Sequence, residues 1–127
     1  NSGQMLDSEE DPMDEDTFGG ALRTSLSLLG KKYPDLRIVL VSPIYCEIEG
    51  AISEKCYEAD FGGGVLDEYV ELEKQIAKEY GVEWLDMYHG SGIWEENIDV
   101  YLADKLHLTA EGVELLGNRI ADYLEER

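Results

Sequence analysis

The stretch that decides the fold is Leu36-Arg37-Ile38-Val39-Leu40-Val41, which Ser42-Pro43 brings to an end. All of its residues except Arg37 are aliphatic, and three of them are β-branched. A short, nearly continuous apolar run of this kind is typical of a parallel strand that is buried on both faces. We therefore predict a β-strand over residues 36–41.

Helical spacing flanks this strand on both sides. After Asp16 or Thr17, both good N-caps, apolar residues recur at helical intervals until Gly30 and Tyr33-Pro34. A second helical pattern begins at Leu66, has Tyr80 near its end and stops at Gly81. Further on, Val82 to Tyr88 has the composition of a second strand, and Thr109 can cap a last helix with apolar positions Val113, Leu116, Ile120 and Leu124. The alternation of helices and strands predicts an α/β fold.

Two buried parallel strands and three helices make an incomplete object, because such strands need neighbours on both edges and cover on both faces. The pattern predicts the C-terminal half of a three-layer α/β/α, flavodoxin-like fold with parallel strands. We expect residues 1–127 to form a single domain, with residues 1–16 as an acidic loop. An N-terminal half or a second copy of the chain is expected to complete the sheet.

Charge and composition exclude several kinds of partner. The chain has 127 residues and a formal net charge of -19, so phosphate backbones and anionic lipid headgroups would be repelled. No stretch approaches the roughly 18 apolar residues that span a bilayer, and the first residues are acidic where a signal peptide would be basic. We expect no nucleic-acid partner and no membrane span, and the cellular compartment stays open.

Neither a metal nor a cofactor is predicted. The acidic run from Asp7 fails the EF-hand pattern, since Pro12 and Phe18 stand where Gly and Glu are required. Cys46 and Cys56 lack the paired spacing of a structural zinc site, and they form either a free thiol pair or one disulfide.

The most informative residues for chemistry are Asp104 and His107, just before the last helix. At this spacing in a turn, the carboxylate can accept the imidazole Nδ1–H and leave Nε2 free as a general base. These are two members of a Ser-His-Asp triad. The alternative is that Asp104 pairs with Lys105 or water and that His107 is an exposed residue near a helix start.

Four segments, in order, resemble the SGNH (GDSL-type) family of esterases and lipases. The segment Asp104-Lys105-Leu106-His107, followed by a turn and a helix, is similar to the last block of that family. Residues 32–43 resemble its penultimate strand, residues 80–88 its last strand, and Ser91-Gly92-Ile93 the loop beside its substrate. The resemblance implies an SGNH hydrolase fold and the hydrolysis of carboxylic esters, with His107 as the base and Asp104 holding it.

The chain departs from the family in its missing nucleophile. The family carries its nucleophilic Ser, its oxyanion Gly and its oxyanion Asn in earlier blocks, and none of these can be placed here. Ser42, Ser53 and Ser91 lie in expected loops, but none stands on a strand-to-helix elbow. The Ser is therefore expected outside this chain.

The expected substrate is a small-molecule acyl or acetyl ester, of a carbohydrate or a lipid. Tyr45, Trp94 and Tyr101 fall in loops beside the expected site and are candidates to stack on a sugar or to line an acyl pocket. The alternative hypothesis is a non-catalytic ligand-binding or assembly module that has lost the nucleophile.

Overall fold

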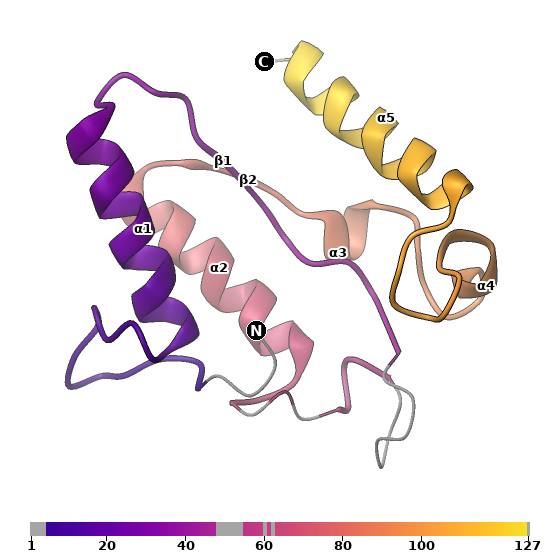
Figure 1. The fold of residues 1–127 in the computed structure, drawn as a ribbon, viewed down its shortest axis with the longest axis horizontal. Helices are drawn as coiled ribbons and strands as arrows, with labels where there is room; N and C mark the ends of the chain where they lie inside the picture. The colour runs from indigo at the N-terminus through magenta and orange to yellow at the C-terminus, as the bar shows by residue number, and fades with distance from the viewer. Residues whose placement is uncertain (1–4, 48–54, 60, 62, 127) are drawn as a thin grey trace.

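The computed structural model describes residues 5–47, 55–59, 61 and 63–126. In this part of the chain, helices and strands follow one another along the sequence as Figure 1 shows. They are α1 (Phe18–Lys32), β1 (Val39–Val41), α2 (Leu66–Tyr80), β2 (Glu83–Leu85), α3 (Met87–Gly90), α4 (Ile98–Tyr101) and α5 (Ala110–Glu126).

The first helix begins where the sequence predicts it. Thr17 is its N-cap, and its hydroxyl accepts a hydrogen bond from the amide of Gly20 at 2.9 Å. Of the two predicted stop signals, Gly30 and Tyr33-Pro34, only the second ends the helix, because α1 continues to Lys32. Residues before proline are pushed out of the helical region, so Pro34 and not Gly30 ends α1.

Helix α2 matches its prediction at both ends. It runs from Leu66 to Tyr80, and Gly81 ends it in the left-handed conformation with a φ of 65°. A side chain is strained at such a φ, which is why glycine suits this position. The buried face of α2 includes Tyr69, Val70 and Ile76, and the helix packs against both α1 and β2.

The two strands pair in parallel, as the sequence predicts. Val39 lies opposite Glu83 and Leu40 opposite Trp84. Both strands are shorter than predicted, with three residues each. The expectation that the first strand is buried on both faces is also wrong, because Val41 is 43% exposed.

The second strand ends early because Asp86 starts a new helix. Its carboxylate accepts a hydrogen bond from the amide of His89 at 2.9 Å and caps α3. Met87 and Tyr88, predicted as the end of the strand, are therefore helical, and both are buried. Tyr101, which is expected in a loop, lies at the end of the short helix α4.

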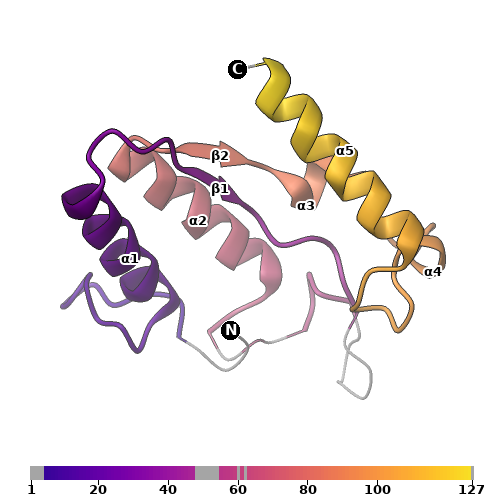
Figure 2. The same ribbon diagram turned by 45° about the horizontal axis from the view of Figure 1, so that its top comes forward.

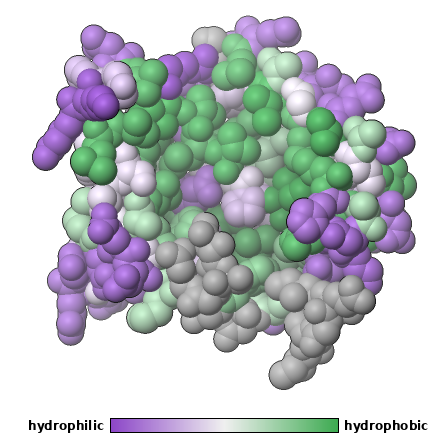
Figure 3. All heavy atoms as spheres, in the orientation of Figure 1, coloured by the Kyte–Doolittle hydropathy of each residue, from purple (hydrophilic) through white to green (hydrophobic). Residues whose placement is uncertain are grey.

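The strands lie between two groups of helices. Helices α1 and α2 contact each other on one side, and α5 lies on the other side of the strands (Figure 2). The apolar stripe predicted for the last helix is only partly covered, since Val113 is 59% and Leu124 is 48% exposed. In Figure 3, hydrophobic side chains spread across the centre of the face that is viewed in Figure 1.

A cluster of buried hydrophobic residues lies beyond the carboxyl ends of the strands. It joins the segment after β1, the start of α2 and the short helices α3 and α4. Its buried members are Tyr45, Cys46, Cys56, Leu66, Tyr69, Val70, Tyr88, Ile93, Ile98 and Leu102. In open α/β folds, ligands bind outside the carboxyl ends of the strands. The cluster therefore lies in the part of the molecule where a site is expected.

The acidic segment near the start of the chain is fastened to the helices by Arg23. The buried guanidinium lies 2.7 Å from a carboxylate oxygen of Asp7 and 3.4 Å from one of Glu79. The hydrogen bond from Arg23 holds the pKa of Asp7 below its usual value. None of the helices in the described residues has the length and apolar character that crossing a membrane requires.

Candidate functional site

A closed turn just before α5 carries the predicted pair. Leu102 and Leu108 form an antiparallel bridge at its base, and the amide of Ala103 donates to the carbonyl of His107 at 2.8 Å. Lys105 stands in the turn with a φ of 66°, in the left-handed region that few side chains adopt. Within the turn, Asp104, Leu106 and His107 are exposed.

The carboxylate of Asp104 contacts His107 at two points. One oxygen accepts the backbone amides of Leu106, at 3.1 Å, and of His107, at 2.6 Å. The other oxygen lies 2.6 Å from Nδ1 of the His107 ring. These bonds favour the ionised carboxyl, and the backbone bond from His107 contributes most to lowering the pKa of Asp104 to about 2.

This geometry fixes the tautomer of His107. A carboxylate on the Nδ1 side keeps the proton there and leaves the lone pair of Nε2 available to accept another. The His107 side chain is 76% exposed, so the free nitrogen can reach a molecule outside the chain. The structure thus brings the two predicted residues together in the arrangement that a general base needs.

Glu47 anchors the turn to the segment that follows β1. Its amide donates to the carbonyl of Lys105 at 3.0 Å, and its buried carboxylate lies 3.8 Å from the Lys105 ammonium. The same carboxylate accepts the hydroxyl of Tyr45 at 2.8 Å and lies 3.3 Å from the ammonium of Lys55. Glu47 therefore links its own segment to Lys55 and to the turn that carries His107.

A second carboxylate–imidazole pair lies at the carboxyl end of β2. Nδ1 of His89 is 2.7 Å from Oδ2 of Asp86, and the amide of His89 donates to Oδ1 of the same carboxylate. The spacing and the bonds repeat those of Asp104 and His107. The His89 ring, however, packs edge-on against Tyr88, with ring centroids 4.9 Å apart.

The three aromatic residues predicted to meet substrate lie at different depths. Tyr45 is fully buried and belongs to the core. Trp94 is partly buried, packs 4.5 Å from Tyr45 and stacks on Tyr57 with their planes only 9° apart. Tyr101 is partly buried at the end of α4. Only Trp94 and Tyr101 therefore retain exposed surface.

No serine in the described residues is placed as a partner of His107. The hydroxyl of Ser42 accepts the amides of Met87, at 2.8 Å, and Tyr88, at 2.9 Å, and it is buried. Ser91 is fully buried, and its hydroxyl accepts the amide of Ile93. Ser53 lies outside the described residues. The two placed hydroxyls thus organise the loops after the strands.

Sequence reasoning missed Glu47 and did not recognise the pair of Asp86 and His89. The second pair carries the same D-x-x-H spacing as the first, so a search for that spacing would have found it. Glu47 gives no such signal, because its partners lie 8 and 58 positions further along the chain. Long-range contacts of this kind become visible only in the fold.

Comparison with known proteins bears on the fold. No protein-family model matches the sequence, and no curated protein matches it. A solved structure from Lactobacillus plantarum is similar with a TM-score of 0.85 and 24% identity, over 98% of this chain and 60% of that one. A "possible lipase" from Chitinophaga pinensis is similar with a TM-score of 0.72 and 15% identity, over 98% of this chain and 67% of that one. A "putative GDSL-like lipase" from Parabacteroides merdae is similar with a TM-score of 0.54 and 18% identity, over 77% of this chain and 44% of that one.

These likenesses show the fold. The two strands and their helices correspond to part of the α/β/α domain of GDSL-like lipases, which agrees with the predicted C-terminal half of that fold. The chain spans about 60% of the length of the Lactobacillus structure.

Proposed function

We propose that this chain supplies the acid–base half of an ester-hydrolase site of the SGNH type. His107 is the general base, and Asp104 orients it and stabilises its protonated form. The observation that carries the proposal is the 2.6 Å contact between His107 Nδ1 and Asp104 Oδ2, beside an exposed ring. The lipase-like structural neighbours support a hydrolase fold.

The proposed reaction is acyl transfer to water. A serine hydroxyl from outside residues 1–127 attacks the ester carbonyl while Nε2 of His107 takes its proton. His107 then returns that proton to the leaving alcohol as the carbonyl re-forms. In the second half, His107 activates water, which releases the acid and restores the serine. Throughout, Asp104 faces Nδ1 and keeps the imidazolium paired.

We propose a small acyl or acetyl ester as the substrate, with Trp94 and Tyr101 beside it. Their partly exposed rings can cover a sugar face or an acyl chain. Tyr45 was a third candidate, and its full burial supports a role beneath Trp94, holding that ring in place.

The test compares the two histidines. In the intact polypeptide that contains this chain, His107→Ala should lower the hydrolysis of 4-nitrophenyl acetate by about 10³-fold or more. The matched control is His89→Ala, which removes the other carboxylate-paired imidazole and should leave the rate unchanged. Full activity in the His107→Ala enzyme, with a native circular-dichroism spectrum, would refute the proposal.

A second candidate function is a ligand-binding module without turnover. It is favoured by the absence, among the residues that the structure describes, of a serine hydroxyl on His107. This hypothesis predicts that the intact polypeptide binds an acetylated sugar in calorimetry but does not hydrolyse it, and that Asp104→Asn leaves the affinity unchanged. Measurable hydrolysis that depends on His107 would eliminate it.

A further inference from the structure

Cys46 and Cys56 face each other across a short antiparallel pairing. Glu47 bridges to Lys55, so Cys46 and Cys56 form the next cross-strand pair. The amide of Cys56 donates to the carbonyl of Cys46 at 3.2 Å, which closes that pair. Opposed residues in such a pair have side chains on the same face and Cα atoms about 5.5 Å apart. This separation lies within the range that a disulfide spans.

The environment of the pair makes Cys56 easier to ionise than Cys46. Both cysteines are free and buried in the same apolar cluster. A hydrogen bond between the two thiols lowers the pKa of Cys56 and raises that of Cys46. The hydroxyl of Tyr88 lies 3.5 Å from the Cys56 sulfur and adds to its stabilisation. An attacking sulfur and a resolving sulfur are therefore next to each other.

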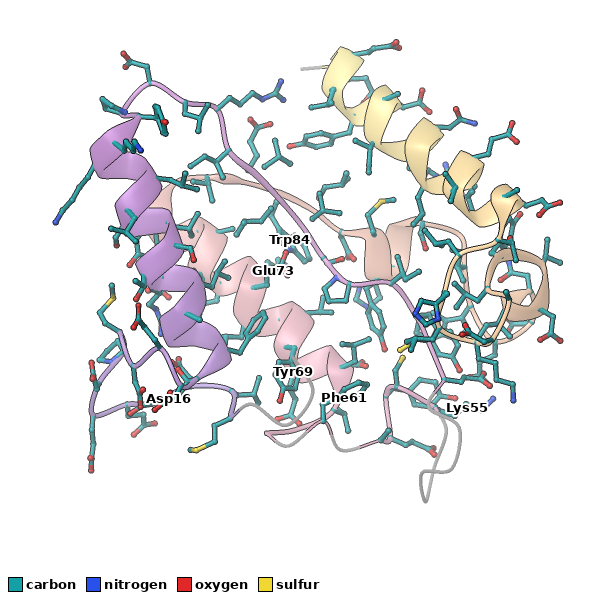
Figure 4. All side chains as sticks on the ribbon, viewed as in Figure 1. Asp16, Lys55, Phe61, Tyr69, Glu73 and Trp84 are labelled. Atoms are coloured by element: carbon teal, nitrogen blue, oxygen red, sulfur yellow. The ribbon has the colours of Figure 1, made fainter. Side chains whose placement is uncertain are left out.

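The pair is joined to the turn that carries His107. Cys46 precedes Glu47, whose amide and carboxylate hold Lys105. Cys56 follows Lys55, whose ammonium lies against the same Glu47 carboxylate and 2.9 Å from Glu95. Figure 4 places Lys55 at the end of the molecule near α4. A disulfide between the two sulfurs would therefore restrain Glu47 and Lys55, which are the sequence neighbours of Cys46 and Cys56.

We propose that Cys46 and Cys56 are an oxidative modification site, at which a reversible disulfide locks the Glu47–Lys55 pairing and shifts the turn of residues 104–107. The oxidant is a hydroperoxide small enough to reach a buried sulfur during local opening. The Cys56 thiolate attacks the peroxide oxygen, and the O–O bond breaks to give Cys56 sulfenic acid and hydroxide. The Cys46 sulfur then attacks the Cys56 sulfur and releases water. Two thiols and one hydrogen peroxide thus give one disulfide and two waters.

Peptide mapping tests the bond itself. Trypsin cuts after Arg37, Lys55 and Lys74, so the two cysteines fall in separate peptides, 38–55 and 56–74. After hydrogen peroxide and denaturing alkylation, we expect these two peptides joined by a disulfide, and separated again by dithiothreitol. In Cys46→Ser, Cys56 should instead be trapped as a sulfenic acid by dimedone. Two separate alkylated peptides after peroxide, or disulfides only between molecules, would overturn the proposal.

A nuclear magnetic resonance experiment tests the coupling to the turn. The chain has two histidines, so the imidazole carbon–proton correlations of His107 and His89 can be resolved and assigned by substitution. Oxidation should move the His107 signal and leave that of His89 in place, and Cys46→Ser should abolish the effect. An unmoved His107 signal in the mapped disulfide form, or equal movement of both signals, would refute the coupling. Neither readout requires hydrolysis, so failure of this inference is distinct from failure of the proposed function.

Discussion

Glu73 is a buried carboxyl that the proposed chemistry does not use. It lies on α2 with 6% of its surface exposed and accepts the indole N–H of Trp84 at 3.2 Å. Figure 4 shows the two side chains meeting between α2 and the strands. Burial raises the pKa of Glu73 to about 7, and its hydrogen bond with Trp84 opposes that rise.

The raised pKa makes the stability of the protein depend on pH. The folded state holds the proton more tightly than the unfolded chain does, so the contribution of Glu73 is complete below about pH 4.5 and is lost as pH rises through 7. Glu73→Gln should raise the free energy of unfolding at pH 8 by about 2 kcal/mol and leave it nearly unchanged at pH 4. Urea titrations at both pH values measure the difference. Glu71→Gln, an exposed position of α2, is the control, and equal gains in both variants would contradict the assignment.

Asp104 can be tested without removing its backbone contacts. Asparagine keeps an oxygen for the amides of Leu106 and His107, but it loses the charge that pairs with the imidazolium. Asp104→Asn should therefore lower the kcat of ester hydrolysis by about 10³- to 10⁴-fold with little change in KM. Asp86→Asn makes the same substitution in the second pair and should leave kcat unaltered. The opposite pattern would move the proposed base to His89.

The two residues of the candidate dyad were predictable because their segment resembles a block of a known family and because their contacts are local. Three positions separate Asp104 from His107, and every bond between them follows from that spacing. The roles of Glu47 and Ser42 were not predictable, since each serves a segment far along the chain. Tyr45 was expected to face substrate because it falls in a loop beside the expected site, but it is fully buried and packs against Trp94.

At the scale of elements, the sequence predicted helices better than strands. The bounds of α2 follow from its apolar spacing and from Gly81, which are both local. Strand β2 ends before Asp86 because the Asp86 carboxylate caps α3. The sequence through Tyr88 has the composition of a strand, so a longer strand was predicted. The exposure of β1 depends on which other segments pack over it, and the local sequence pattern does not contain that information.

Substitutions at two glycines of α1 distinguish the effect of close packing from that of helix propensity. A Cβ on Gly20 would lie 1.9 Å from the carbonyl oxygen of Asp14. Apart from its chain neighbours and the nearby backbone of α1, nothing in the described structure lies within 4 Å of one on Gly30. Gly20→Ala should lower the free energy of unfolding by about 2 kcal/mol or more, because backbone atoms must move. Gly30→Ala should raise it by about 0.5–1 kcal/mol, since alanine favours the helix. Urea unfolding measures both, and similar effects of the two changes would contradict the placement of α1 against the acidic segment.

At the scale of the molecule, the outer edge of β1 and one side of α5 expose apolar surface. Among the described residues β1 pairs only with β2, and Val41, Leu36, Val113 and Leu124 all keep more than a third of their surface exposed. Open apolar strand edges pair with other chains. The net charge of -19 opposes such contacts, so added salt should strengthen them.

The polypeptide of residues 1–127 should therefore associate through β1. Sedimentation velocity should show species above 14.3 kDa, with a share that grows with concentration and salt. Val41→Lys places a charge on the strand and should shift the population toward the monomer. Leu28→Lys, which changes an exposed apolar residue of α1, is the control. A monomer at every concentration and salt would contradict the prediction.

The two D-x-x-H turns orient their histidines by local contacts. In each, one aspartate binds both the amide and the ring of a histidine three positions later. Contacts within four consecutive residues therefore fix the tautomer, and contacts with distant parts of the chain are not needed for it. Each imidazole is thus oriented by its own turn before any substrate arrives, and the surrounding fold holds the turn of residues 104–107 in place and decides what the free nitrogen meets.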